Sequence, residues 1–427
     1  MHTLSFALLG AAALTIVLAT ALLAAPLESP IWPDLLSSLS FWETSPGFQS
    51  EPLDSPVSGL EPPRRAPTLE APSPFTSPTT RTRTRAIPII KAIYLTSWSA
   101  ATPSRLTQAL GLISATELNA VVIDVKDYSG KVVFDTSNQI IGAIGSEERR
   151  LDLAGLVQRF HAKGIYVIVR IAVFQDQHLI KVSPHLAVRD TQGRIWRDRK
   201  GLGWVDPAST EVWQYVVEVS REAARAGVDE LNFDYIRFPS DGNLSAIRYP
   251  MFDPRTRTRR EVLQQFFAYL TTELREAGPV LSADLFGLTT VRQDDLGIGQ
   301  VVEDALLFFD VVAPMVYPSH YARGFLGYKN PAAHPYEVVS YSLAQAQKRR
   351  QVLAEAIAAL DEGDERQDAA YQIGQIRPWL QAFDLGAPYP PRAIRSQMQA
   401  VADAGLSVGW LLWSPSNRYH PASFKSQ

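Results

Sequence analysis

"DELNFDYIRFPSDG", residues 229–242, begins as a buried strand and ends in a turn that carries charged and polar residues. Successive side chains of a strand point to opposite faces, so residues two apart share a face. One face, toward covering helices, holds Leu231, Phe233 and Tyr235. The other face holds Asn232 and Asp234. Because a buried carboxylate is costly unless it is paired or hydrogen-bonded, this stretch predicts a strand that carries polar groups to a functional site.

Strand-like segments recur eight times after residue 88, with helical patterns between them. The predicted strands are residues 92–98, 120–127, 166–174, 230–238, 281–288, 310–318, 376–383 and 408–414. The predicted helices are residues 103–117, 151–163, 209–226, 257–277, 342–361 and 390–404. Repeated strand-then-helix order implies parallel pairing, and eight such units close a (β/α)8 TIM barrel. The alternative is a doubly wound sheet, but no Gly-rich phosphate loop follows the first strand to favour it.

The composition of the 427-residue chain narrows the classes of partner and chemistry. A net charge of -3 gives no sign of a nucleic-acid partner, which normally requires a strong basic excess. The chain has no cysteine, which excludes disulfides, thiol nucleophiles and thiolate metal sites. With 46% hydrophobic and 20% charged residues, the chain can bury a large core.

The first 87 residues differ in composition from the rest. Residues 4–25 form an uncharged apolar run long enough to cross a membrane, so residues 1–25 are a signal peptide or a membrane anchor. An uncleaved anchor is favoured, because no Lys or Arg precedes the run and Leu22 and Leu23 stand where a cleavage site needs small residues. Residues 26–87, rich in Pro, Ser and Thr, predict a disordered linker. The domain of residues 88–427 is therefore expected to be exported, either membrane-anchored or secreted.

Polar residues come late in several otherwise apolar strands, followed by long loops at residues 128–150, 175–205, 239–256 and 319–341. In a barrel these positions meet at the carboxyl end of the strands, where active sites form. The polar residues outside strand 230–238 are Asp124 and Lys126, Arg170, Ser282 and Asp284, Tyr317, and Gln381. A structural layer of salt bridges explains any one of them, but it explains the whole set less well.

Carboxylates are the catalytic groups that remain after elimination. The chain has no "GxSxG" motif, and its seven histidines show no metal-ligand spacing, so neither a metal nor a cofactor is expected. Two carboxyl groups suit the hydrolysis of glycosidic bonds. The preferred pair is Asp234, kept ionised by Arg170 or Arg237 as nucleophile or stabiliser, and Asp284 as the acid, although these roles could be reversed. The reserve candidates are Asp124, Asp127, Glu303 and Asp304.

The expected substrate is a polysaccharide or oligosaccharide, because flat aromatic rings near the strand ends suit the C–H faces of sugars and polar groups suit the hydroxyls. Membrane contact is expected only through the N-terminal segment, if it is uncleaved. The predicted substrate-binding residues are Asp124, Lys126, Asp127, Arg170, Asn232, Arg237, Tyr317, Trp379, Gln381 and Trp413.

Six motifs occur in order along the barrel: "YLTSW", "VVIDVKDYSG", "GWVDP", "DELNFDYIRFP", "ADLFG" and "APMVYPSHY". This set resembles a family of bacterial glycosyl hydrolase domains over residues 88–420. The resemblance implies a TIM barrel and carbohydrate hydrolysis.

The segment "GVDELNFDYIRFP" is also distantly similar to the fourth strand of chitinase-type glycosidases, Gly-x-Asp-x-x-Asp-x-Asp-x-Glu. On that pattern Asp229 and Asp234 match, Asn232 replaces an acid, and Ile236 stands where the resemblance would place the catalytic glutamate. A general acid must therefore come from another strand. The main alternative is a non-catalytic carbohydrate-binding or cell-wall scaffold domain. A deacetylase or lyase is less favoured, because a deacetylase usually needs a His and Asp metal set.

Overall fold

A computed structural model describes residues 86–361 and 373–426 of the chain. The predicted anchor or signal peptide of residues 1–25 lies outside the described residues, as does nearly all of the predicted linker of residues 26–87. No helix in the described part of the chain is both long enough and apolar enough to span a membrane.

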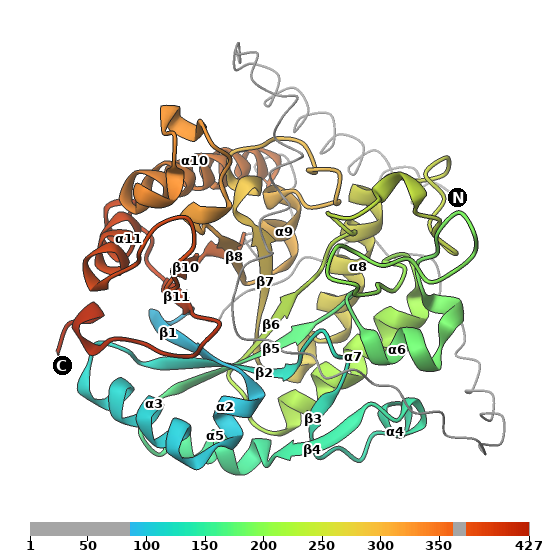
Figure 1. Cartoon of the computed structure of the whole chain (residues 1–427), viewed down its shortest axis with the longest axis horizontal. Coiled ribbons are helices and arrows are strands. Elements are labelled where there is room, and N and C mark those ends of the chain that lie inside the picture. The colour runs from blue at the N-terminus through green and yellow to red at the C-terminus, as the bar shows by residue number, and fades with distance from the viewer. Residues whose placement is uncertain (1–85, 362–372, 427) are drawn as a thin grey trace.

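Eight parallel strands close into a barrel, which confirms the predicted fold (Figure 1). The barrel strands are β1 (Ile90–Leu95), β2 (Ala120–Lys126), β5 (Tyr166–Ala172), β6 (Glu230–Asp234), β7 (Val280–Phe286), β8 (Val311–Met315), β10 (Trp379–Gln381) and β11 (Gly409–Trp413). Strand β1 pairs with both β2 and β11, so the sheet has no open edge within the barrel. A doubly wound sheet, which is open at both edges, does not describe this chain.

Helices surround the barrel (Figure 1). They are α3 (Pro103–Ala115), α5 (Leu153–His161), α7 (Thr210–Arg225), α8 (Arg259–Glu273), α9 (Val302–Phe308), α10 (Pro335–Asp361) and α11 (Pro391–Asp403). Their starts follow local sequence rules: Thr258 and Glu261 form a capping box at the start of α8. The apolar face of β6 packs outward as predicted, with the Phe233 ring 6.2 Å from that of Phe309 beside α9. The main core therefore lies between the barrel and its helices.

Smaller elements extend the loops between strands and helices. They are α2 (Ser97–Ala101), β3 (Val132–Phe134), α4 (Gln139–Ile144), β4 (Glu147–Leu151), α6 (Gln177–Val182) and β9 (Gln375–Ile376). Short 3-10 turns span Pro184–Leu186, Leu244–Ala246, Arg275–Ala277, Gly287–Thr290, Pro318–His320, Phe325–Gly327, Pro331–Ala333 and Pro421–Ser423. An isolated antiparallel β-bridge between the backbones of Arg189 and Arg248 joins the loops that follow β5 and β6. The insertions predicted after the strands thus form ordered structure at the carboxyl end of the barrel.

The amino end of the barrel interior contains a buried ion pair that the sequence analysis did not predict. Glu230 begins β6, and Arg377 lies between β9 and β10, where it interrupts the predicted strand 376–383. Arg377 Nη1 donates to both Glu230 carboxylate oxygens at 2.9 and 2.8 Å, and its Nε donates to the Val408 carbonyl at 3.0 Å. Both side chains are fully buried. This end of the barrel is therefore closed by a paired charge.

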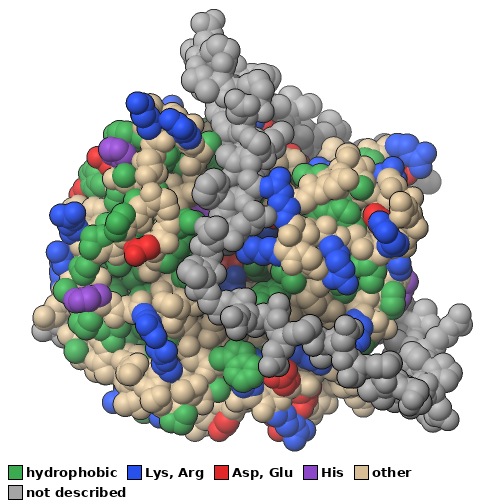
Figure 2. Space-filling view, in the orientation of Figure 1, with side chains coloured by type: hydrophobic (Ala, Val, Ile, Leu, Met, Phe, Trp, Pro, Cys, Tyr) green, Lys and Arg blue, Asp and Glu red, His purple; other side chains and the backbone are tan. Residues whose placement is uncertain are grey.

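The visible surface shows no concentrated charge of one sign. In Figure 2 the Lys and Arg side chains are dispersed over this face among hydrophobic and uncharged groups. This distribution agrees with the small net charge of the chain.

Candidate active site

Strand register brings the predicted polar residues to one level of the barrel interior. Asp124 of β2 pairs in register with Arg170 of β5, and Arg170 pairs with Asn232 of β6. Asn232 in turn lies opposite Ser282 of β7. Neighbours in register on a parallel sheet share a face, so these side chains converge. Asp234 and Asp284, two residues further along their strands, continue the same inner face.

Arg170 is the centre of this cluster. Its Nη1 donates to Asp124 Oδ1 at 2.8 Å, and its Nε and Nη2 both donate to Asp234 Oδ2, the former at 3.1 Å. Its Nε also lies 3.6 Å from Asp284 Oδ2. One guanidinium therefore joins three carboxyl groups from three different strands. Of the two arginines proposed to keep Asp234 ionised, Arg170 is the one that contacts it.

Asp284 lies in the least solvated position of the three carboxyl groups that face Arg170. Its side chain is 1% exposed. Its Oδ1 accepts hydrogen bonds from Asn232 Nδ2 at 2.8 Å and Trp379 Nε1 at 2.7 Å. Burial, and then the nearby charge of Asp234, raise the pKa of Asp284 well above its usual range. Asp284 is therefore suited to hold a proton, which its predicted role as an acid would require.

Asp234 accepts hydrogen bonds from a cationic side chain and from the backbone. Its Oδ1 accepts the Tyr235 backbone N–H at 2.5 Å, and its Oδ2 accepts the two bonds from Arg170. Charge-assisted hydrogen bonds of this kind stabilise a carboxylate. The two preferred carboxyl groups thus have contrasting surroundings, an arrangement that allows one to act as an acid and the other as a base or nucleophile.

Asp124 has a second partner that the sequence analysis missed. The Tyr94 hydroxyl of β1 donates to Asp124 Oδ2. Burial raises the pKa of Asp124 and, with a further contribution from the Asp124 charge, raises that of Tyr94 well above its usual range. Tyr94 is in the quoted motif "YLTSW", and it shares the inner face of β1 with Ala92, two residues earlier. Asp127 lies next to this pair in a turn where its Oδ1 accepts the Ser129 N–H at 2.9 Å.

The charges of the cluster do not balance. Three carboxyl groups share Arg170, and ionisation of all three would leave two uncompensated negative charges in a buried site. The cost of that state favours a retained proton, and the surroundings of Asp284 place it there. Asn232 Oδ1 adds an unused acceptor: it is buried and, within the described structure, has no hydrogen-bond partner. The cluster can therefore donate a proton, stabilise a negative charge and accept a hydrogen bond from a hydroxyl group.

The chain leaves strand β6 earlier than predicted. Tyr235 has a left-handed backbone with φ 54°, which ends the alternation after Asp234. Its ring is 5.8 Å from the Arg170 guanidinium carbon, so the prediction that Tyr235 points toward the helices is wrong. A positive φ at a bulky residue is uncommon and often marks a functional site. Here it allows the Tyr235 N–H to reach Asp234.

Lys126 does not share a face with Asp124. Strand β2 has an irregular register between these residues, so Asp124 pairs with Arg170 and Lys126 with the next residue, Ile171. The expected alternation fails because this bulge adds a residue. Lys126 turns away from the cluster. Its Nζ forms an ion pair with Asp176 at 2.8 Å, donates to the Ala172 carbonyl at 2.7 Å and lies 5.7 Å from the Tyr215 ring of α7. Its position is that of a buried structural cation.

Arg237 is near the cluster but makes no ion pair with Asp234 among the described residues. Its guanidinium carbon lies 4.7 Å from the Trp204 ring and 4.5 Å from the Phe286 ring, in the cation–π range. Its Nη1 donates to Ser240 Oγ at 2.8 Å. Arg237 therefore joins the loops that follow β5 and β6 to the end of β7.

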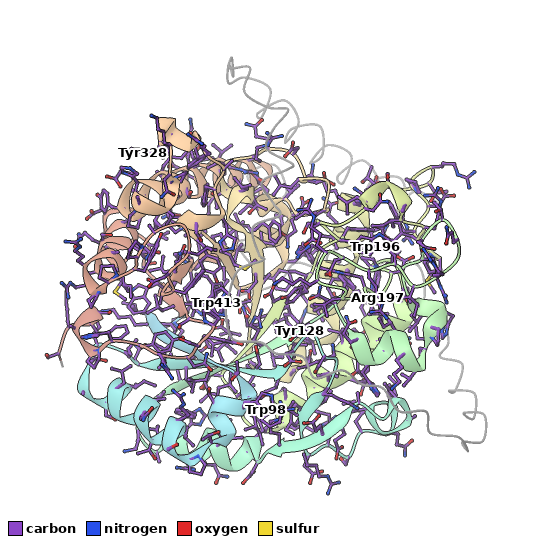
Figure 3. The ribbon with its side chains drawn as sticks, in the orientation of Figure 1. Trp98, Tyr128, Trp196, Arg197, Tyr328 and Trp413 are labelled. Carbon is purple, nitrogen blue, oxygen red and sulfur yellow. The ribbon has the colours of Figure 1, made fainter. Side chains whose placement is uncertain are left out.

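The predicted aromatic residues divide into two groups. Trp379 joins the cluster through its bond to Asp284, whereas Tyr317 and Trp413 stack on each other with ring centres 5.5 Å apart. Trp413 is labelled near the middle of the barrel in Figure 3. Gln381 is fully buried, and its amide bonds to Ser319 and to the Phe383 carbonyl, so it fixes loops and does not face the cluster.

The reserve acids of α9 lie outside the barrel interior. Glu303 pairs with Arg349 and Asp304 with Arg260. Within residues 86–361 and 373–426, no group of three or more His, Asp or Glu residues is arranged to hold a metal ion.

Comparison with known proteins agrees with the fold of the barrel. Residues 92–419 match the model of a family described as "Putative glycosyl hydrolase domain". The chain belongs to this family. The resemblance noted from the sequence motifs is therefore confirmed, and the barrel is a glycosyl hydrolase domain by family. No curated protein sequence matches the chain.

Two solved structures illustrate the similarity. A hypothetical protein from Ruminiclostridium thermocellum is 33% identical, over 48% of this chain and 98% of its own, with a TM-score of 0.42. The glycoside hydrolase domain of PgaB (BpsB) from Bordetella bronchiseptica is 15% identical, over 79% of this chain and 99% of its own, with a TM-score of 0.51. The second match shows that the two proteins share a fold.

Proposed function

We propose that this protein hydrolyses O-glycosidic bonds in an extracellular or cell-envelope polysaccharide, with Asp234 and Asp284 as the carboxyl pair. The observation that carries the proposal is the shared contact with Arg170, which joins a carboxylate to a carboxyl group whose pKa is raised. Asp284 protonates the leaving oxygen, and Asp234 attacks or stabilises the anomeric carbon.

The spacing of the pair supports a retaining mechanism. Asp234 Oδ2 lies 3.1 Å and Asp284 Oδ2 3.6 Å from the same nitrogen, Arg170 Nε, so the two oxygens cannot be farther apart than the sum of these distances. That limit includes the roughly 5–5.5 Å of retaining enzymes and barely reaches the roughly 6.5–9.5 Å of inverting ones. The pair can therefore adopt the retaining arrangement, in which Asp234 would act as the nucleophile.

The envelope location in this proposal depends on the apolar run of residues 4–25 and the Pro-rich segment that follows. A run of this length would direct the chain out of the cytoplasm, and the segment would separate the barrel from a membrane. Fractionation of cells that express the full chain, combined with protease protection, tests this part of the proposal separately. If protease added outside intact cytoplasmic membranes does not digest the barrel, this part of the proposal is contradicted.

The enzymatic part is tested by the release of reducing ends from a panel of soluble polysaccharides. The panel contains hydroxyethyl cellulose, glycol chitin, laminarin, galactomannan and polygalacturonate. We expect Asp234→Asn and Asp284→Asn each to lower the rate on the cleaved member by at least about 1000-fold. The control is Asp135→Asn, because the Asp135 side chain is 66% exposed and pairs only with the surface residue Arg149 in the described structure.

Two results would overturn the assignment. Retained hydrolysis in either carboxyl variant would remove that residue from the pair, and Asp124→Asn would then be tested as the replacement. Binding of a polysaccharide without release of reducing ends would favour the non-catalytic scaffold, a reading that the buried, apolar Ile236 at the chitinase glutamate position permits.

A further inference from the structure

Trp98 is an exposed aromatic residue at the carboxyl end of the barrel. It lies in the short helix α2, directly after β1, and is 62% exposed. Tryptophan has a large apolar surface that a folded chain usually buries, so exposure on this scale is unusual. Its neighbours in α2 are serine and alanine, so it does not belong to a wide apolar surface of the kind that binds another protein.

One face of the Trp98 ring is already covered. The Arg150 guanidinium carbon from β4 lies 3.7 Å from the ring centre, a close cation–π contact. Arg150 is itself fixed, because its Nη1 donates to Ser97 Oγ at 2.5 Å and its Nη2 pairs with Glu148. The Arg150 side chain is only 11% exposed. The contact holds the indole ring in one orientation and leaves its opposite face to solvent.

The backbone under Trp98 is also held in place. Thr96 Oγ1 accepts the Ser99 N–H at 3.2 Å and caps the start of α2. At the other end Thr102 Oγ1 donates to the Trp98 carbonyl at 2.8 Å. A side chain fixed before binding loses less conformational entropy when a ligand arrives, so the ring is preorganised.

The ring is a short distance from the carboxyl groups. Trp98 follows Tyr94, the partner of Asp124, by four residues, which limits the separation of their Cα atoms to about 15 Å. In Figure 3 Tyr128 is labelled above Trp98 and to its right. Burial and the charges of Asp127 and Asp124 raise the pKa of Tyr128, so its hydroxyl is close to these acids. Tyr94 and Tyr128 thus both lie beside Asp124, and Trp98 follows Tyr94 closely in the chain.

We propose that the free face of Trp98 binds a sugar ring of the polysaccharide, a few units away from the bond that is cleaved. The C–H face of a pyranose would stack on the indole ring, while Arg150 supports the ring from behind. This inference rests on the proposed function, because it assigns the ring to the same polymer. It makes Trp98 a binding residue for long chains, with no part in the chemical step.

The test is affinity electrophoresis of the full chain in gels that contain each of the five polysaccharides of the activity panel. We expect Trp98→Ala to weaken binding of the retarding polymer on the order of tenfold. Arg150→Ala should weaken it several-fold, because the ring would lose its fixed orientation. Trp98→Phe should restore part of the binding, and Tyr341→Ala, an exposed aromatic of α10, should match the wild type.

The outcomes separate the two proposals. If a polymer retards the wild type and Trp98→Ala equally, the inference about Trp98 is overturned. If the wild type also releases reducing ends from that polymer, the proposed function still stands. A wild-type protein that neither binds nor cleaves any polymer of the panel overturns both. Thermal melting of Trp98→Ala should equal that of the wild type, because the removed ring is mostly exposed. A large drop in melting temperature would show a structural role for the ring and would also contradict the inference.

Discussion

Strand β6 places an acidic residue at each end of the barrel interior. The two ends differ in the number of carboxyl groups that share one arginine. At the amino end Glu230 is matched by one cation, Arg377, and both are fully buried. At the carboxyl end Asp234 shares its cation, Arg170, with Asp124 and Asp284. The first end is balanced and the second has an excess of acid.

This difference separates structural charge from chemical charge. In a matched buried pair each charge is compensated by its partner. Removing either partner leaves an uncompensated charge. An unmatched buried cluster favours a retained proton, which can be transferred to a substrate. The amino end therefore contributes to stability, and the carboxyl end is the part suited to catalysis.

Replacing Arg170, the cation that the three carboxyl groups share, should have the largest effect of the changes considered. Arg170→Met removes the contact that joins three carboxyl groups and orients Asp234. We expect hydrolysis to fall by at least about 1000-fold, because the two carboxyl groups lose both their charge balance and their geometry. Steady-state kinetics on the cleaved polysaccharide measures the loss. A variant that keeps a tenth or more of the wild-type rate would show that Arg170 is not the organiser of the site.

The same substitution at the other end should act on stability alone. Arg377→Met leaves Glu230 buried without its partner, which costs about 3–5 kcal/mol in the free energy of unfolding. Urea denaturation measures this cost, and the folded fraction should keep the wild-type turnover. Lower turnover per folded molecule would mean that the two ends of the barrel are coupled, and the contrast between them would be lost.

The sequence predicted the framework of this comparison better than its details. Eight apolar segments separated by helical patterns were enough to predict the barrel, because strand and helix have different hydrophobic periods. Alternation along β6 predicted that Asn232 and Asp234 share the inner face, and late polar positions on other strands predicted their partners Asp124, Arg170 and Asp284. Glu230 obeys the same alternation and was missed because it stands at the start of the strand.

The errors arose where the backbone departs from regular geometry. Lys126 follows a bulge and Tyr235 has a positive φ, and neither feature has a signal in side-chain alternation. Gln381 keeps the expected strand position, but its amide is used by a neighbouring loop. Arg377 interrupts a strand that looked continuous in the sequence. Such contacts depend on tertiary packing, which one sequence without relatives does not display.

The protonation of Asp284 sharpens the contrast between the ends. Its raised pKa comes from burial first and from the Asp234 charge second, so Asp234→Asn should lower it and leave burial as the remaining cause. Infrared difference spectroscopy can follow the protonated carboxyl band of Asp284 against pH, with Asp284→Asn as the blank. The band should disappear at a lower pH in Asp234→Asn than in the wild type. An unchanged titration would show that the two groups are not electrostatically linked.

The smallest expected effect is on the pH dependence of stability. The folded protein holds the Asp284 proton to a higher pH than the unfolded chain does, because the pKa is raised on folding. The contribution of this group to stability is therefore fully present below the unfolded pKa and declines as the pH rises toward the folded value. Asp284→Asn removes the ionisable group and keeps an oxygen that can accept from Asn232 and Trp379.

Asp284→Asn should consequently match the wild type in acid and exceed it near neutral pH, by on the order of 1 kcal/mol in the free energy of unfolding. Urea denaturation at several pH values measures the difference, and the exposed control Asp135→Asn should show no such trend. An asparagine variant less stable than the wild type at neutral pH would mean that the ionised Asp284 is favoured by its contact with Arg170. The carboxyl end would then be a balanced structural cluster like the amino end, and Asp284 could not supply the proton for hydrolysis.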